Sequence, residues 1–393
     1  MKASIINPIL TLSVLIAPIF FIFCDSGNKQ GDLPSGDWIE HGFSSEQRNT
    51  LRSFFDEAIQ KKDIAGGALL LIHQDEVIFR EAFGYADLET GRPFTTEDVC
   101  MIASVTKCIT ATLMVILDEQ GVLSLDDPIE KWIPSFADIR LQDGSKPEHT
   151  PLIHQGLSHR SGLPGTADLG RINDVLRGTL SEVVENLTDY GLMAEPGTRY
   201  SYGQAGLRIA ARIAELGTGE KFQAILTRTI LEPLGMSHSV FRPTEELLQK
   251  SPQRYQRKEE GLTPMPKDFL DRFLEMDVDP HGIRFSTLDD IGRFLLFHLN
   301  RGMVNGKRLV SAESLERMYA IPEQLPDPAY GLCWALGPNG PGQAWHLGGS
   351  GTLVWLDFDR DMAGVFFSQT AWVGNRPFQR KLMQTLRSMF EGE

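Results

Sequence analysis

Residues 101–121 read MIASVTKCITATLMVILDEQG, and this stretch decides how the rest of the chain is interpreted. Ser104 and Lys107 stand three positions apart in it, so on a helix both side chains emerge on one face. From residue 105 to residue 117 nearly every side chain is apolar, which is typical of a helix buried inside a domain. Gly121 supplies a stop signal for that helix. The stretch therefore predicts a buried helix whose first turn carries a hydroxyl beside an amine.

This pair of side chains predicts a nucleophile next to a base. Burial takes an ammonium out of water and favours its neutral form, which would let Lys107 accept a proton from the Ser104 hydroxyl. Backbone N–H groups at the helix N-terminus would lie beside Ser104, where an oxyanion needs donors. The spacing alone is weak, because Ser26 and Lys29 repeat it in a polar stretch with no apolar helix behind it. The structural alternative is a helix cap beside a solvated lysine.

Composition narrows the possible function classes. The 393 residues carry a formal net charge of −14, which argues against binding nucleic acid through its phosphates. The nine histidines are scattered and form no metal-binding motif, so we expect no metal site, and structural roles for His154 and His159. Among the four cysteines, Cys108 falls inside the apolar helix as a buried thiol, while a single bridge between Cys100 and Cys333 stays open.

The N-terminus has the layout of a secretory leader. Lys2 precedes an uncharged, largely apolar run over residues 3–23, and a polar stretch follows Cys24. Cys24 in this place suggests a bacterial lipoprotein with acyl chains on that cysteine, although Phe23 stands where such signals normally carry a small residue. An uncleaved anchor is the alternative, because about 20 apolar residues can cross a bilayer. Either interpretation predicts an extracytoplasmic protein, periplasmic or at the cell surface, tethered to a membrane through its N-terminus.

The rest of the chain predicts one domain built from both of its ends. Residues 1–24 form the leader, 25–43 a linker rich in Gly, Pro and Asp, and 44–391 the folded domain. We expect an α+β fold, an α/β/α sandwich, in which a largely antiparallel sheet comes from about 44–100 and 325–391 and a helical subdomain from about 101–324. Strands are expected at 67–73, 77–85, 330–335, 351–357 and 363–369, and the main further helices at 44–62, 180–187, 206–216, 222–230, 288–300 and 376–390.

A first later segment that could complete the site is residues 197–207. It places Tyr200 in a Gly-rich loop just before a helix, where the phenol could face a cleft. A cationic lysine nearby would lower the pKa of this phenol toward use as a base. The alternative is a half-buried tyrosine whose hydroxyl is satisfied locally.

The second such segment, residues 345–351, enters a late strand. Gly348 and Gly349 would allow a substrate to approach the backbone closely, and His346 would line the cleft. The N–H of Gly349 could pair with that of Ser104 as an oxyanion hole. Taken singly, the segment is better explained as a Gly-rich hairpin loop with a surface imidazole.

Together, these three segments resemble, in order, the signatures of serine β-lactamases and penicillin-binding proteins. The closest likeness is to class C β-lactamases with their D-alanyl-D-alanine peptidase and esterase relatives, and it covers about residues 64–369. The resemblance implies the β-lactamase/transpeptidase-like fold. Further segments similar to recurrent family text are 103–107, 157–163, 233–236, 284–290 and 330–334.

The resemblance also implies a role for each residue. Ser104 would be the acylated nucleophile and Lys107 the proton acceptor beside it. Tyr200 would help to deprotonate Ser104, protonate the leaving group and later activate water for deacylation. Gly349 and Ser104 would supply the backbone oxyanion donors, and no metal or organic cofactor would take part.

Two departures from the family pattern bear on the substrate. The family's second motif is Tyr-x-Asn, and Tyr202 stands in the place of the Asn, where a phenol cannot reproduce the contacts of an amide. The third motif is Lys-Thr-Gly in class C β-lactamases and begins with His346 here. A largely neutral imidazole anchors a substrate carboxylate less well than an ammonium does.

We therefore expect a serine hydrolase that cleaves a small ester, amide or peptide through a Ser104 acyl-enzyme, with esterase or peptidase activity preferred. The first alternative is a β-lactamase or a D-alanyl-D-alanine carboxypeptidase. The second is a binding protein that kept the fold and lost turnover. Neither a nucleic acid nor a protein partner is implied.

Overall fold

The computed structural model describes residues 32–168, 175–176, 178–266, 284–320, 329–337, 342–372 and 377–391. The main compact unit begins at Leu33. The expected leader, including Cys24, lies outside the described residues. Within the described ranges, no helix has both the length and the apolar character needed to cross a bilayer.

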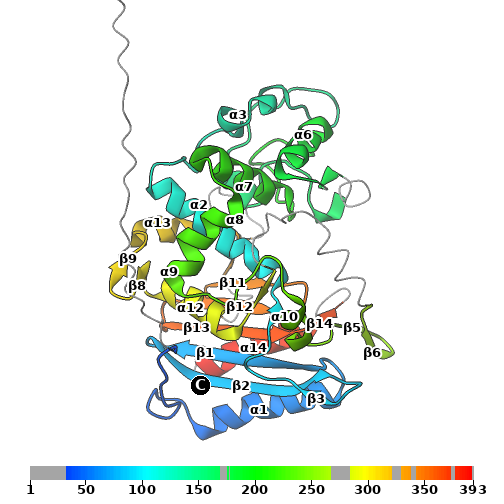
Figure 1. Cartoon of the computed structure of the whole chain (residues 1–393), viewed down its shortest axis with the longest axis vertical. Coiled ribbons are helices and arrows are strands. Elements are labelled where there is room, and N and C mark those ends of the chain that lie inside the picture. The colour runs from blue at the N-terminus through cyan, green and yellow to red at the C-terminus, as the bar shows by residue number, and fades with distance from the viewer. Residues whose placement is uncertain are drawn as a thin grey trace, which may run out of the picture. The chain divides into compact units, whose positions relative to one another are not determined.

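A seven-stranded antiparallel sheet forms the centre of this unit (Figure 1). Its order is β10-β11-β12-β13-β1-β2-β3, so strands from the end of the chain lie directly beside strands from its start. The prediction of one largely antiparallel sheet assembled from both ends is confirmed. The strands are β1 (Gly66–His73), β2 (Glu76–Asp87), β3 (Arg92–Pro93), β10 (Ala335–Leu336), β11 (Ala344–Leu347), β12 (Leu353–Asp357) and β13 (Met362–Ser368).

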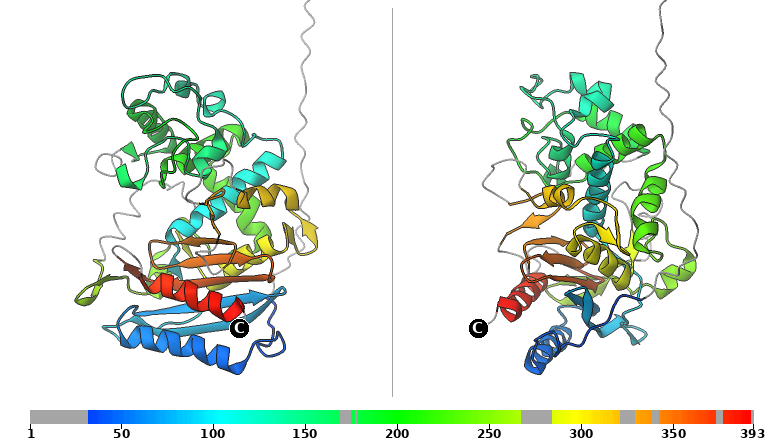
Figure 2. Two further views of the ribbon diagram at one scale, coloured as in Figure 1. Left: turned by 180° about the vertical axis from the view of Figure 1, so that it is seen from behind. Right: turned by 90° about the vertical axis from the view of Figure 1, so that its left-hand side faces the viewer.

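Both faces of the sheet are buried, because side chains alternate along each strand. Leu70 of β1 belongs to a hydrophobic core that includes the central helix, whereas its neighbour Leu69 belongs to a second core. Helix α12 (Leu288–Leu299) covers the first face, although it falls in the segment expected to form the helical subdomain. Helices α1 (Ser45–Gln60) and α14 (Pro377–Glu391) cover the second face (Figure 2). Helices on both faces of an antiparallel sheet confirm the α+β class.

The middle of the chain is mostly helical (Figure 1). Helix α2 (Thr106–Glu119) is buried from Thr106 to Leu117, as its apolar sequence predicts, and it packs against α7 (Ala205–Thr218). The other described helices are α3 (Ile129–Trp132), α4 (Ile153–Leu157), α6 (Leu180–Tyr190), α8 (Phe222–Leu226), α9 (Glu232–Leu234), α10 (Glu245–Lys250) and α13 (Ala312–Glu316), with short turns η2 (Pro134–Asp138), η3 (Thr166–Asp168), η4 (Thr227–Leu231) and η5 (Arg317–Tyr319).

Small sheets complete the described structure. β4 (Cys100–Met101) pairs with β7 (Phe285–Ser286) immediately before the central helix. The remaining short strands are β5 (Tyr255–Lys258), β6 (Gly261–Pro264), β8 (Met303–Val304), β9 (Lys307–Arg308) and β14 (Thr370–Trp372). Cys100, Cys108 and Cys333 are buried free thiols, so the bridge left open between the first and the last of them does not form.

Residues 33–43 pack against the domain, although their composition predicts a linker. Val77 of β2 donates its N–H to the carbonyl of Pro34 at 2.7 Å and accepts the N–H of Gly36 at 3.0 Å. The side chain of Trp38 is only 1% exposed and belongs to the second core. The buried indole and the two backbone hydrogen bonds therefore fix this segment on the domain.

Candidate active site

Ser104 lies in the turn that leads into α2 rather than in the helix itself. This turn, η1 (Ala103–Val105), is one turn of 3-10 helix, and α2 begins at Thr106. Ala103 has a φ of 47°, a left-handed conformation that is costly for a residue with a Cβ atom. Backbone strain of this kind clusters at functional sites, and here it directly precedes the predicted nucleophile.

The side chain of Lys107 reaches from the first turn of α2 to Ser104. Its Nζ atom lies 3.3 Å from Ser104 Oγ, so the structure brings the predicted pair together. Lys107 is 2% exposed and Ser104 is half-buried. The same Nζ lies 5.3 Å from the centre of the Tyr202 ring, which is a cation–π distance. A hydroxyl, a buried amine and a phenol ring therefore lie side by side.

The loop before α7 carries two tyrosines, and the structure places them differently. Tyr202 faces Lys107, whereas the ring of Tyr200 lies 5.4 Å from the guanidinium carbon of Arg160 and 5.3 Å from the ring of Tyr330. Among the described residues, no hydrogen bond joins the hydroxyl of either tyrosine to Lys107 or to the nucleophile, so the difference lies in the ring contacts. Burial, together with the neighbouring Tyr202 phenol, raises the pKa of Tyr200 above its ordinary value. The expected lowering of this pKa is therefore wrong.

Backbone hydrogen bonds hold this tyrosine loop in place. Ser201, between the two tyrosines, donates its N–H to the carbonyl of His159 at 2.8 Å. Gly197 donates its N–H to the carbonyl of Arg160, also at 2.8 Å. On the other side of the loop, the carbonyl of Tyr202 accepts the N–H of Thr166 at 2.6 Å. The segment that follows α4 therefore sets the position of both phenols.

His346 of β11 is buried, with 4% of its surface exposed. Its Nδ1 atom lies 3.0 Å from the carbonyl of Leu347, which can only accept, so Nδ1 carries a proton. Its Nε2 atom lies 3.1 Å from the hydroxyl of Tyr330, which is the donor when the imidazole is neutral. Both ring nitrogens have partners within the protein, in contrast to the substrate-facing imidazole that the sequence suggests.

The loop that follows β11 is fastened to the strand that precedes the nucleophile. Gly348 donates its N–H to the carbonyl of Thr352 at 2.8 Å. The hydroxyl of Thr352 donates to the carbonyl of Ile102 at 3.0 Å, and that of Ser350 to the carbonyl of Met101 at 2.6 Å. These bonds hold the Gly-rich loop beside η1, which also contacts β11.

The two predicted oxyanion donors have suitable surroundings. Gly349 is exposed, and a Cβ atom built on it would meet nothing within 4 Å, so it borders open space. Ser104 lies in the first turn of a helix, where an N–H has no acceptor within the helix. Gly348 is instead tightly packed, because a Cβ atom there would lie 1.8 Å from Thr352 Oγ1.

Three side chains that surround the site were not predicted from the sequence to be site residues. His159, Arg160 and Tyr330 all pack against the two loop tyrosines. The available signal was that residues 157–163 and 330–334 resemble recurrent family text. That resemblance indicates a shared fold segment, and it does not reveal which side chain turns toward the site.

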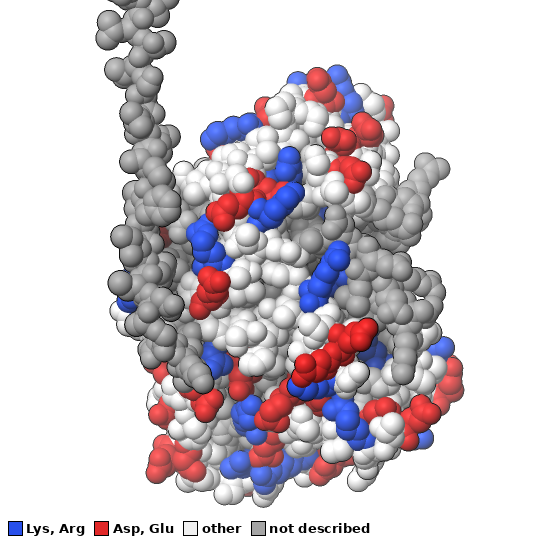
Figure 3. Space-filling model, in the orientation of Figure 1, with Lys and Arg blue, Asp and Glu red and all other residues white. Residues whose placement is uncertain are grey.

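Among the described residues, no group of three or more His, Cys, Asp or Glu side chains could hold a metal ion. On the face drawn in Figure 3, acidic and basic side chains are interspersed.

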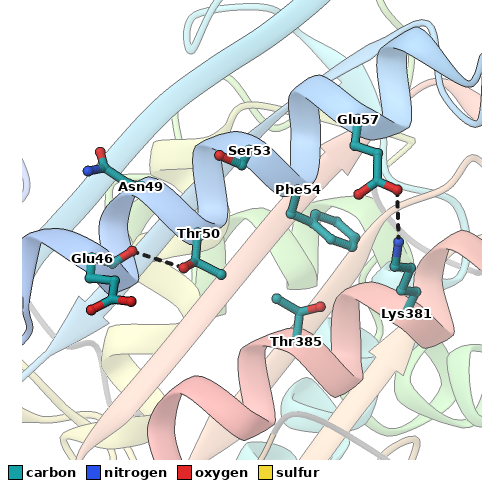
Figure 4. A pocket seen from close by; sticks show the side chains of 8 residues that line it. All are labelled: Glu46, Asn49, Thr50, Ser53, Phe54, Glu57, Lys381 and Thr385. Atoms are coloured by element: carbon teal, nitrogen blue, oxygen red, sulfur yellow. Dashed lines mark hydrogen bonds and ion pairs between the residues drawn. The ribbon is translucent and has the colours of Figure 1, made fainter.

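A separate open groove lies between α1 and α14, where polar side chains of both helices surround Phe54 (Figure 4). Since these helices cover the second face of the sheet, the groove is not part of the Ser104 site.

Comparisons with known proteins identify the family and the fold of the chain. The family model described as Beta-lactamase matches residues 51–383. The chain is 31% identical over 294 residues to Penicillin-binding protein 4 of Amycolatopsis lactamdurans, a match that covers 74% of this chain and 73% of that protein. It is 32% identical over 209 residues to Esterase EstB of Burkholderia gladioli, which covers 50% of this chain and 52% of EstB. The solved structure of EstCE1, a hydrolase with promiscuous acyltransferase activity, superposes with a TM-score of 0.73 at 22% identity, covering 87% of this chain and 98% of EstCE1.

Proposed function

Because the chain belongs to the β-lactamase family of serine hydrolases, we propose that it cleaves an ester or amide through an acyl-enzyme on Ser104. The observation that carries this proposal is the 3.3 Å distance between Ser104 Oγ and Nζ of the buried Lys107. A desolvated amine beside a hydroxyl is placed to take the proton as the oxygen attacks a carbonyl carbon. The N–H groups of Ser104 and Gly349 would then hold the oxyanion of the tetrahedral intermediate.

We assign the phenol of this proton circuit to Tyr202 rather than to Tyr200. Tyr202 has its ring beside Nζ of Lys107, while burial makes the Tyr200 phenol harder to deprotonate. In this role Tyr202 would share a proton with Lys107, deliver it to the leaving group and activate the deacylating water. The proposed mechanism is therefore the one expected from the family, with Tyr202 in place of Tyr200.

With this assignment, the Tyr-x-Asn motif begins at Tyr202 instead of Tyr200. Counted from Tyr202, the third position of the motif is Gln204, which bears the amide that Tyr202 lacks. Gln204 is the N-cap of α7, and its side chain makes no capping hydrogen bond, so the helix does not use its amide. An amide donor and acceptor is therefore present at the position where the family has one.

The surroundings of His346 favour ester over carboxylate-bearing substrates. In the neutral form its two nitrogens bond to Leu347 and Tyr330, so it offers no cation to a substrate carboxylate. We therefore prefer an esterase or an amidase for uncharged substrates. A β-lactamase or a D-alanyl-D-alanine carboxypeptidase is the second candidate, and the amide of Gln204 is the observation that favours it.

The two neighbouring tyrosines offer a matched test of the assignment. We expect Tyr202→Phe to lower kcat for a short-chain aryl ester by about 10²-fold or more, because general acid–base groups typically contribute that much. Tyr200→Phe should stay within about threefold of the wild-type rate, since its hydroxyl has no part in the proton transfer. The reverse order of the two effects would return the role to Tyr200.

Turnover of two substrate classes separates the two candidate functions. Hydrolysis of aryl esters without hydrolysis of a chromogenic cephalosporin supports the esterase, and efficient cephalosporin turnover supports the β-lactamase. Ser104→Ala serves as the control for both, because any activity that survives it does not come from this nucleophile.

We also propose that the N-terminus tethers the enzyme to a membrane outside the cytoplasm, through acyl chains on Cys24. Support comes from the charged, apolar and cysteine-terminated order of the leader. Palmitate incorporation into the full chain should disappear in Cys24→Ala. Incorporation that persists in this variant would contradict the lipoprotein proposal.

A further inference from the structure

We propose that His159 is a positioning residue, whose ring and backbone hold the Tyr202 phenol against Lys107. The inference rests on the proposed function, because it concerns the same proton circuit. His159 itself touches neither Ser104 nor Lys107 through a hydrogen bond among the described contacts, so it would act through the tyrosine.

The ring of His159 packs at the centre of the aromatic side chains around the site. It is 5% exposed, and its centre lies 4.6 Å from the ring of Tyr202. The rings of Tyr330 and Tyr200 lie 5.2 Å and 5.9 Å away. Since three phenol rings contact one imidazole, removing that imidazole would leave Tyr202 without its closest lateral support.

The backbone of His159 fixes the same loop from a second direction. Its carbonyl accepts the N–H of Ser201, the residue directly before Tyr202. To present both this carbonyl and its ring to the loop, His159 adopts a φ of 60°, which non-glycine residues seldom do. Strain held by a buried residue beside a proposed active site indicates that its conformation is selected for function.

One ring nitrogen of His159 provides an independent indication. Its Nε2 atom is buried and, among the described residues, has no hydrogen-bond partner. A buried polar atom without a partner costs stability, and such atoms are uncommon in native proteins. His159 is therefore kept at a cost in stability, as expected of a residue that serves the site rather than the fold.

The charges around His159 keep its imidazole neutral. Burial is the largest cause, and the neighbouring Lys107, His346 and Arg160 side chains add to it, so the pKa of His159 lies well below its ordinary value. The other titratable groups that face the ring are the phenols of Tyr200, Tyr202 and Tyr330. Because its pKa lies so low, the imidazole is a weak base and does not compete with Lys107 for the proton of Ser104. It therefore supports the phenol without entering the proton transfer.

The test uses His159→Asn, because asparagine tolerates a positive φ. We expect it to slow phosphonylation of Ser104 by a fluorophosphonate about tenfold or more, since small displacements of catalytic groups carry penalties of this size. The acid limb of the pH–rate profile should keep its midpoint, because His159 does not titrate there. His154→Asn is the matched control: its ring lies beside Leu125 and Asp126, and it should leave the rate unchanged.

Coupling to Tyr202 distinguishes positioning from a general loss of structure. If His159 acts through the phenol, His159→Asn in a Tyr202→Phe background should change the rate by less than about twofold. The proposal would be overturned if the rate loss of the double variant equalled the product of the losses of the two single variants. A wild-type rate in His159→Asn would also overturn it. Equal labelling of wild type and Ser104→Ala would instead overturn the proposed function, so the two failures are distinguishable.

A measurement on the wild-type protein decides the matter if His159→Asn does not fold. Phosphonylation of Ser104 should shift the ¹⁵N resonances of the His159 imidazole, because the Lys107–Tyr202 pair on which it packs must rearrange. Unchanged imidazole resonances on modification would contradict the proposal.

Discussion

Ala103 has a strained backbone conformation directly before the nucleophile. Its φ of 47° is tolerated with a methyl side chain, but a β-branched side chain clashes with the backbone in this conformation. We expect Ala103→Val to lower the free energy of unfolding by about 1–2 kcal/mol and to reduce ester turnover more than the lost stability explains. Urea unfolding and steady-state kinetics measure the two effects.

Ala103→Gly is the matched control for this substitution. Glycine adopts a positive φ without steric cost, so this variant should keep both the fold and most of the activity. Wild-type turnover in Ala103→Val would show that the conformation at this residue is not needed for the chemistry.

At the same scale, the sequence located Ser104 and Lys107 but assigned the phenol to Tyr200, whereas the contacts in the structure favour Tyr202. A spacing of three on a buried helix is local information, and the pair indeed lies 3.3 Å apart. Two tyrosines that alternate in an extended loop project to one side, so spacing cannot rank them. The difference comes from tertiary contacts, with Arg160 against one ring and Lys107 against the other.

Among the elements, α2 and α12 are joined by a buried polar network centred on His298. The hydroxyl of Thr112 donates to the carbonyl of Cys108 at 2.8 Å, so it accepts from His298 Nε2, 3.1 Å away. The hydroxyl of Tyr319 then donates to His298 Nδ1 at 2.6 Å. Both nitrogens of a neutral imidazole are therefore satisfied, and a second ring proton would lose the bond to Tyr319.

This network predicts a loss of stability in acid. Burial lowers the pKa of His298 from an ordinary value of 6.5 to about 3, so between these values the unfolded chain binds a proton that the folded chain does not. Stability from this group is complete above pH 6.5 and falls as the pH decreases toward 3.

His298→Gln tests this prediction, because glutamine can still form hydrogen bonds but does not titrate. The free energy of unfolding of both proteins is measured by urea at several pH values. The wild type should be the more stable of the two, and this difference should shrink by roughly 1 kcal/mol per pH unit in acid. A difference that stays constant with pH would contradict the assignment.

The elements that the sequence predicts well are those stabilised by local interactions. Helix α1 begins after Ser44, whose side chain forms the expected capping box with Gln47. The β1–β2 hairpin matches to within two residues, because its strands are long and turn through Gln74 and Asp75, both with positive φ. Strands β4 and β11 were not predicted, since two to four residues paired only with distant segments carry no periodic signal.

On the scale of the whole molecule, the segment before α1 is part of the fold. We expect Trp38→Ala to lower the free energy of unfolding by about 3–5 kcal/mol, because a fully buried aromatic side chain is removed from the second core. The neighbouring Ile39 is 54% exposed, so Ile39→Ala should change stability by less than about 0.5 kcal/mol. Equal effects of the two substitutions would mean that the segment only rests on the surface.

The sheet assembled from both ends of the chain was predictable, because apolar runs at each end could be buried only against one another. The site was less so. Its groups come from η1, the loop before α7, the segment after α4 and strand β11. These segments lie up to roughly 240 residues apart in the chain, and only the packing of the sheet and α2 brings them together. Composition also hid the packing of Trp38, since the Gly, Pro and Asp residues around it are typical of a linker.

The central claim is that the hydroxyl of Ser104 becomes covalently acylated. Mass-spectrometric mapping of the wild-type protein after treatment with a fluorophosphonate tests this most directly. We predict one adduct per chain, located on Ser104 and absent from Ser104→Ala. An adduct on another residue, or equal modification of Ser104→Ala, would contradict the account.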